Sequence, residues 1–191
     1  NSVSYIKDAV RFRSNLIGEY PYNVVSAVEA QMGFPGGMEY PTITSITKTM
    51  NPKDLDEVIE HEVGHNWFYG ILANNERIHP WMDEGINSYY DNRYTNWKYP
   101  SPKHYPEIGE PTLLNALAKK RKDQAIETAS IDFTDYNYGL VAYYKTSIWM
   151  KQMENYLGRE KFDEAMRAYF QEWKFKHPRP EDFFETLERV G

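Results

Sequence analysis

The sequence predicts an α+β fold that is mainly helical, with a small β element near the N-terminus. Most of the chain repeats apolar residues at the three- and four-residue spacing of a helix, whereas two β-prone runs, 23–31 and 42–49, lie close together in its first quarter. No shift in composition marks a boundary, and 191 residues suffice for one sizeable core. We therefore expect a single domain over residues 1–191.

Composition excludes several classes of protein and site. A net charge of −6 disfavours general binding to nucleic acids or anionic membranes, and the absence of cysteine excludes disulfides and thiolate metal sites. No apolar run approaches the ~20 residues of a membrane span. The first residues carry neither the basic nor the apolar region of a signal peptide, so we expect any signal peptide to lie outside this chain. We expect a soluble protein, and the compartment stays open between the cytoplasm and the periplasm or secretion. Because the chain lacks an initiator methionine, we also expect it to be a piece of a longer protein.

The first predicted helix covers residues 5–16, where apolar side chains recur at i, i+4, i+7 and i+11. A glycine and a proline shortly afterwards bring it to an end. The two β-prone runs follow, and the segment 33–41 between them contains the adjacent glycines Gly36 and Gly37. Such a pair lets the backbone approach a ligand closely, although its commoner use is a simple turn.

The next predicted helix opens near residue 51 and carries the motif H-E-x-x-H, formed by His61, Glu62 and His65. Residues four apart lie on one face of a helix, so the two imidazoles can bind one metal ion. Glu62 is placed to act as a general base without being a ligand. A catalytic zinc site has three protein ligands, and Glu84, reached after eighteen residues, is the candidate third.

A further helix from about Asp83 places Glu84 in its first turn. Asn87 and Asp91 share roughly the same helical face, where they either support the ligands or are solvated. The other histidines stand among loop-like residues and are expected to be ordinary surface or turn residues: His79, His104 and His177.

The remaining chain predicts an irregular connection and then more helices. Four prolines within 95–112 indicate a long surface loop. The helix that follows ends in the basic run 119–122, which we interpret as a solvated helix end because the net charge is acidic. Three more helices are predicted over 138–157, 160–175 and 180–190.

In combination these motifs resemble the zinc aminopeptidases of the gluzincin group, the family of aminopeptidase N and leukotriene hydrolase. That family has H-E-x-x-H, eighteen residues and E, with G-x-M-E-N upstream and Y-x-K-G downstream. Here Gly36-Gly37-Met38-Glu39 precedes the metal motif, and Tyr143-Tyr144-Lys145-Thr146 follows it. The resemblance covers nearly the whole chain and implies a thermolysin-like catalytic domain whose flanking parent domains are absent.

The resemblance also implies roles for individual residues. One Zn²⁺ per chain would be bound by His61, His65 and Glu84, with Glu62 as the general base. Glu39 would accept the free amino group of the substrate, beside the glycines and Met38 of its segment. Tyr143 would donate a hydrogen bond to the tetrahedral oxyanion, with Tyr144 as the competing candidate. The chain departs from the family pattern at three places: Tyr40-Pro41, Asp83 and Thr146.

The implied partners are peptides with a free N-terminus and the remaining domains of the parent chain. H-E-x-x-H alone is shared with endopeptidases, and only the carboxylate of Glu39 favours an aminopeptidase. A non-catalytic scaffold of the same fold and the hydrolysis of a small lipid epoxide at the same zinc are further alternatives.

Overall fold

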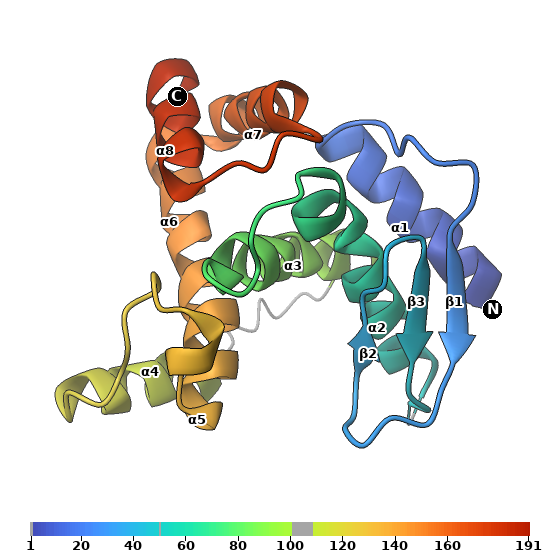
Figure 1. Ribbon diagram of the computed structural model, residues 1–191, viewed down its shortest axis with the longest axis horizontal. Coiled ribbons are helices and arrows are strands. Elements are labelled where there is room, and N and C mark those ends of the chain that lie inside the picture. Colours follow the sequence, from blue (N-terminus) through green and yellow to red (C-terminus); the bar gives the residue numbers. More distant parts are fainter. Residues whose placement is uncertain (1, 50, 101–108) are drawn as a thin grey trace.

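The computed structural model describes residues 2–49, 51–100 and 109–191 (Figure 1). Helices dominate it, and one small sheet lies beside the N-terminal helices, so the predicted fold class is confirmed. Within these ranges we find no helix with both the length and the apolar character needed to cross a membrane.

The sheet of the described chain has three strands, β1 (Ser26–Glu29), β2 (Gly37–Met38) and β3 (Ile43–Ile46). The central strand is β3, which is parallel to β1 and antiparallel to β2. β1 and β3 fall inside the two β-prone runs. The sequence does not predict β2, because two residues are too few to show alternation. This short edge strand lies beside the helix that carries H-E-x-x-H (Figure 1).

Helix α1 (Ser2–Leu16) packs against α2 (Pro52–Gly64), and its apolar face buries Ala9 and Phe12. α2 begins with a proline after Asn51, whose side-chain oxygen accepts hydrogen bonds from two backbone N–H groups of the first turn. The start of the metal-motif helix is thus fixed by a local cap, and its position by α1.

Two short segments lie between α2 and α3 (Ile86–Lys98): η1 (Asn66–Ile71), whose backbone is kinked and non-helical at Phe68 and Tyr69, and the π-helical turn η2 (Trp81–Gly85). In η2 the backbone N–H of Ile86 bonds to the carbonyl of Trp81, five residues earlier. Such wide turns inside helices occur often at functional sites. Here the wide turn holds the residues Asp83 and Glu84.

The predicted loop over 95–112 is wrong at both ends, because residues 95–98 are the last turn of α3 and residues 109–112 already belong to the next helix. Trp97 of α3 packs against Phe12 of α1, with ring centroids 5.4 Å apart, so tertiary contact extends the helix. Residues 101–108 of that predicted loop lie outside the described residues. After them, α4 (Gly109–Lys119) ends at the first residue of the basic run.

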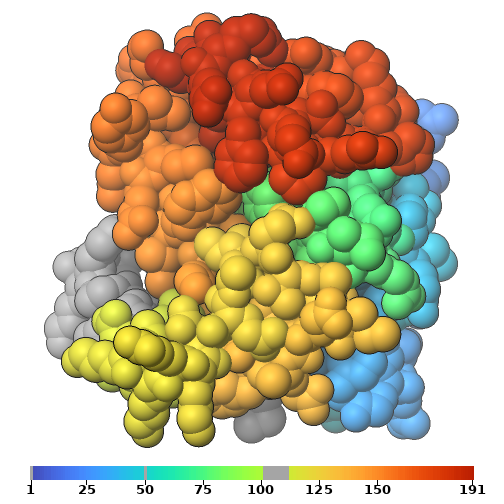
Figure 2. All heavy atoms as spheres, turned by 60° about the vertical axis from the view of Figure 1, so that its left-hand side comes forward, coloured from blue at the N-terminus to red at the C-terminus, as the bar shows by residue number. Residues whose placement is uncertain are grey.

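The C-terminal part is helical. Its elements are η3 (Ser130–Asp132), α5 (Asp135–Asn137), η4 (Tyr138–Lys145), α6 (Thr146–Leu157), α7 (Arg159–Trp173) and α8 (Pro180–Val190). The predicted helix over 138–157 corresponds to η4 and α6 together, the one over 160–175 to α7, and the one over 180–190 to α8. The last two helices cover one end of the molecule and lie over the segment between α2 and α3 (Figure 2).

The core lies where α2 and α3 meet these C-terminal helices. Large aromatic side chains fill it completely, among them Trp67, Trp81, Tyr90, Phe162, Phe170 and Phe183. A close-packed core of this kind allows little movement. It therefore gives the side chains of α2 and η2 a rigid support.

Candidate metal centre and active site

His61 and His65, at and just beyond the end of α2, face Glu84 of η2. Their Nε2 atoms are 3.2 Å apart, and Oε2 of Glu84 lies 3.4 Å from Nε2 of His61 and 3.3 Å from Nε2 of His65. The side chains of His65 and Glu84 are buried, whereas that of His61 is 21% exposed and opens into a cleft. The structure thus brings the three predicted ligands, which we call the triad, to one point.

Carboxylates fix the orientation of both imidazoles. Oδ2 of Asp91 lies 2.6 Å from Nδ1 of His61, and Oδ1 of Asp83 lies 2.5 Å from Nδ1 of His65. A carboxylate in this position holds the imidazole proton on Nδ1 and leaves the Nε2 lone pair available for a metal ion. Three atoms with lone pairs therefore point at one another, an arrangement that a cation stabilises.

The triad fits zinc. Bonds of about 2.0–2.1 Å in a tetrahedral site put neighbouring ligand atoms about 3.3–3.4 Å apart, and the observed separations are 3.2–3.4 Å. Oε2 of Glu84 is buried and accepts no hydrogen bond from a described residue. Burial lowers the pKa of His61 and His65, but the surrounding carboxylates outweigh it and raise both values. This negative environment favours a bound cation.

Glu62 lies beside the triad without belonging to it. The residue is 5% exposed, and its Oε2 has no hydrogen-bond partner within the described chain. Burial, together with the charges of Glu39 and Glu84, raises the pKa of Glu62 to about 7 against the opposing effect of the two imidazoles. A carboxylate that titrates near neutral pH can both take up and return a proton. Gly37 permits this position, because a Cβ there would lie 2.4 Å from Cδ of Glu62.

The segment that contains Gly36 and Glu39 borders the same site. Backbone and side-chain hydrogen bonds to Thr47 fix Gly36, whose φ of 110° suits glycine. Carboxylate oxygens of Glu39 lie within 4.8 Å of ligand atoms of Glu62 and His65, and also of both acidic residues of η2. Glu39 is therefore on the His65 side of the triad, where its carboxylate can receive a cationic group.

The two candidate tyrosines differ in their surroundings. The ring of Tyr143 stacks on His61, with centroids 6.1 Å apart and planes 14° apart, whereas Tyr144 is 36% exposed. Burial, the charge of Glu84 and a hydrogen bond with that carboxylate raise the pKa of Tyr143 far above its ordinary value. A hydroxyl that stays protonated beside the triad is a hydrogen-bond donor throughout the physiological pH range. The geometry thus favours Tyr143 over Tyr144.

Two residues that support the site, Asp83 and Arg13, were not assigned this role from the sequence. In the sequence, Asp83 was noted only as a departure from the family pattern, yet its carboxylate contacts Nδ1 of His65. Arg13 of α1 is fully buried, with Nε 2.5 Å from Glu60 Oε1 and Nη2 2.7 Å from Asp91 Oδ1. A signal was present, since Arg13 stands four residues after Ala9 on the buried face of its helix. A charged residue in that position needs buried partners.

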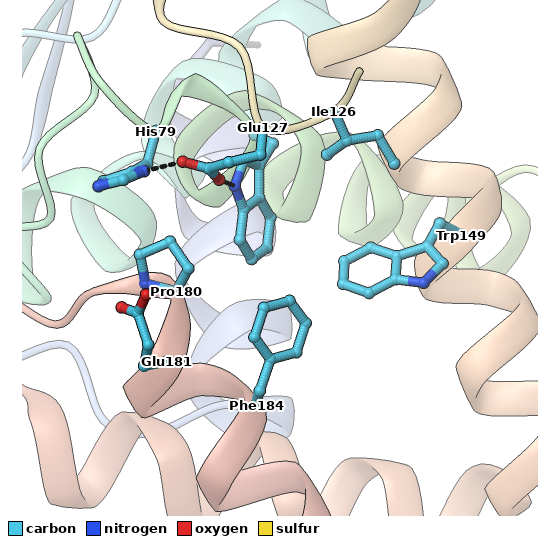
Figure 3. A pocket seen from close by; sticks show the side chains of 8 residues that line it. His79, Ile126, Glu127, Trp149, Pro180, Glu181 and Phe184 are labelled. Atoms are coloured by element: carbon cyan, nitrogen blue, oxygen red, sulfur yellow. Dashed lines mark hydrogen bonds and ion pairs between the residues drawn. The ribbon is translucent and has the colours of Figure 1, made fainter.

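A second cavity, of about 320 Å³, lies between η2 and α8 (Figure 3). His79 and the indole N–H of Trp81 both bond to the carboxylate of Glu127 (Figure 3). Aromatic rings of Trp149 and Phe184 line the other walls. The bonds to Glu127 hold the beginning of η2, and so they help to position Asp83 and Glu84, two and three residues after Trp81.

The histidines outside the motif do not join the triad. His79 takes part in the contact just described, and Nδ1 of His177 lies 2.9 Å from the carbonyl oxygen of Ala73. Neither belongs to a group of metal-ligand candidates among the described residues. His104 lies outside the described residues.

A helix with H-E-x-x-H, a carboxylate from the next helical segment and a small sheet at their side form an arrangement that is typical of metallopeptidase domains. Residues 10–191 match the family described as the peptidase family M1 domain. The chain belongs to the peptidase M1 family.

Known proteins and structures agree with this assignment. Leucine aminopeptidase 2 of Ajellomyces capsulatus is 30% identical over 150 residues, and aminopeptidase B of Rattus norvegicus is 27% identical over 198 residues. They cover 74% and 94% of this chain. Native yeast LTA4 hydrolase matches 96% of the chain with a TM-score of 0.79 and 25% identity. An M1 zinc metallopeptidase from Deinococcus radiodurans matches 97% with a TM-score of 0.74 and 15% identity, which supports the fold alone.

The chain is much shorter than these proteins. It spans 24% of the leucine aminopeptidase and 29% of aminopeptidase B, and it corresponds to 31% and 40% of the two solved chains.

Proposed function

We propose that the chain is the catalytic domain of a zinc aminopeptidase, which hydrolyses the N-terminal peptide bond of peptides. The observation that carries this proposal is the triad, whose three ligand atoms lie 3.2–3.4 Å apart, with the carboxylates of Glu62 and Glu39 beside it. The names of the relatives, leucine aminopeptidase and aminopeptidase B, support the same activity.

Zinc held by the triad would supply Lewis-acid activation of water and of the scissile carbonyl. Glu62 takes a proton from the attacking water on its carboxylate and then gives it to the leaving amine. Its raised pKa, about 7, suits both transfers, because neither protonation state is strongly favoured near neutral pH. Its burial also keeps the carboxylate from being solvated by bulk water.

Tyr143 donates its hydroxyl hydrogen to the oxyanion that develops on the scissile carbonyl. Its ring is held against His61, so the donor is oriented before the substrate arrives. One such donor is typically worth about 2.7–4 kcal/mol in the transition state. At the other end, Glu39 receives the α-ammonium group and so sets which peptide bond meets the triad.

The role of Glu62 is tested by Glu62→Gln. This variant keeps the shape of the side chain but cannot act as a base, so we expect zinc content to be unchanged and the hydrolysis of leucyl peptides to be lost. Glu160→Gln, an exposed change on α7, is the matched control. Near-normal turnover by fully zinc-loaded Glu62→Gln would contradict the assignment.

The distinction from an endopeptidase depends on Glu39. We expect Glu39→Gln to reduce the cleavage of peptides with a free amino terminus much more than that of N-acetylated peptides, because only the former present an ammonium group. Equal losses on both substrates would favour the endopeptidase.

A further inference from the structure

The cleft beside the triad extends well beyond the groups needed for hydrolysis. It is a cavity of about 710 Å³ that runs over His61 between α2 and α3. Its far walls are polar and acidic, formed by Glu57, Ser88, Asn92 and Thr95. Glu39 is not among its lining residues and stands on the His65 side of the triad. The cavity also touches Gly36, Gly37 and Glu62, so it begins beside the segment that carries Glu39 and extends past His61 to Glu57.

This arrangement sets the direction of a bound peptide, if the proposed function holds. An amino terminus at Glu39 and a scissile carbonyl at the triad send the following residue over His61 into the cavity. Glu57 precedes His61 by one turn of α2, about 6 Å along the helix axis. An extended peptide advances about 3.3–3.6 Å per residue. The carboxylate of Glu57 is thus within reach of the side chain that directly follows the cleaved bond.

The charge of this wall is negative. Among the described residues that line the cavity, the acidic ones are Glu57, Glu62 and Asp91, and none is lysine or arginine. Asp91 is balanced by His61 and Arg13, and Glu62 serves the chemistry.

The carboxylate of Glu57 keeps capacity for another cation. It accepts a hydrogen bond of 3.2 Å from Oγ1 of Thr95 and lies 3.4 Å from Nζ of Lys53. The side chain of Lys53 is 52% exposed, and such surface pairs contribute little.

We infer that Glu57 is a specificity-determining residue, which favours substrates with lysine or arginine directly after the cleaved bond and disfavours acidic residues there. The inference rests on the proposed function and names the class of peptide that the cleft takes.

The test compares two tripeptides with N-terminal leucine and C-terminal alanine, one with lysine and one with glutamate between them. With the zinc-loaded chain at low salt, kcat/KM should favour the lysine peptide by about 1.5- to 5-fold, as expected for partly exposed charge pairs. Salt should reduce this ratio. Glu57→Gln should bring it close to one, and Glu57→Lys should invert it.

Two controls separate Glu57 from general charge effects. Glu160→Gln removes the same charge far from the cleft and should keep the ratio of the unchanged chain. Lys53→Gln removes the cation that competes for Glu57 and should maintain or increase the ratio. A ratio near one in the unchanged chain, or a ratio that survives Glu57→Gln, overturns the inference.

Binding keeps this test separate from the test of the activity. If neither tripeptide is cleaved, the proposed function fails, and calorimetric affinities of both for Glu62→Gln decide the inference about Glu57. The inference about Glu57 is supported if Glu62→Gln binds the lysine peptide more tightly than the glutamate peptide and the double variant, Glu57→Gln with Glu62→Gln, loses this preference. Equal affinities of Glu62→Gln for the two peptides contradict the inference.

Discussion

Asp91→Asn changes the support of one ligand while leaving all three ligands in place. Asp91 contacts Nδ1 of His61 at 2.6 Å and Nη2 of Arg13 at 2.7 Å, and Arg13 is fully buried. Asparagine has one acceptor oxygen, so its NH₂ group must face one of the two donors. We expect zinc affinity to fall about 10- to 100-fold, as is typical for loss of such a partner. This loss corresponds to about 1.4–2.7 kcal/mol in the free energy of zinc binding.

The same change should lower the free energy of unfolding of the metal-free chain by about 1.5–3 kcal/mol, the usual contribution of a hydrogen bond to a charged group. Asp163→Asn is the control. Asp163 on α7 accepts hydrogen bonds from Arg93 on α3 through both of its carboxylate oxygens, and this pair lies away from the triad. This variant should reduce stability similarly and leave zinc affinity unchanged. Zinc affinity is measured by competition with a chromogenic chelator, and the free energy of unfolding is measured by urea titration. Unchanged zinc affinity of Asp91→Asn, or an equal loss in Asp163→Asn, would refute the reasoning.

Three further predictions concern the base, the oxyanion donor and a distant ion pair. Gly37→Ala should lower kcat by on the order of 100-fold because its Cβ displaces Glu62, while Gly33→Ala, with no neighbour within 4 Å, should not. Tyr143→Phe should lower kcat by about 10²–10³-fold, and Tyr144→Phe far less; equal effects would reverse the assignment. Hydrogen bonds from Lys151, Arg159 and Tyr89 outweigh burial and hold the pKa of Glu154 below its ordinary 4.5. Its stabilisation is therefore complete above about pH 4.5 and lost as pH falls through the lowered pKa. Urea unfolding should show Glu154→Gln destabilised by about 1–2 kcal/mol at pH 7 and progressively less in acid, and a difference independent of pH would contradict this origin.

The two histidine ligands are predictable from helix periodicity, and the carboxylate ligand from its spacing in the sequence. His61 and His65 face the same way on any helix, and the distance in sequence to Glu84 matches a known pattern. The predicted helix boundaries near the C-terminus also agree closely, since α7 and α8 bury continuous apolar faces.

The supporting residues depend on tertiary structure instead. The widened turn η2 directs both Asp83 and Glu84 towards His65, whereas adjacent residues of a regular helix diverge by about 100°. Gly85 lets η4 and α6 approach this turn, because a Cβ there would lie 2.4 Å from the carbonyl oxygen of Ala142 and 2.3 Å from Cβ of Thr146. Arg13 reaches Asp91 only because α1 packs on α2. Such contacts join residues up to 78 positions apart, and no local pattern contains them.

We propose that one zinc ion at the triad gives this chain aminopeptidase activity, and a zinc titration tests this proposal most directly. Zinc is added stepwise to the metal-free chain, and bound metal and hydrolysis of a leucyl peptide are measured at each step. We expect activity to rise in proportion to bound zinc and to level off at one ion per chain, with His65→Ala failing to retain the ion. Stoichiometric binding without any hydrolysis, or hydrolysis that persists after the metal is removed, would contradict the account.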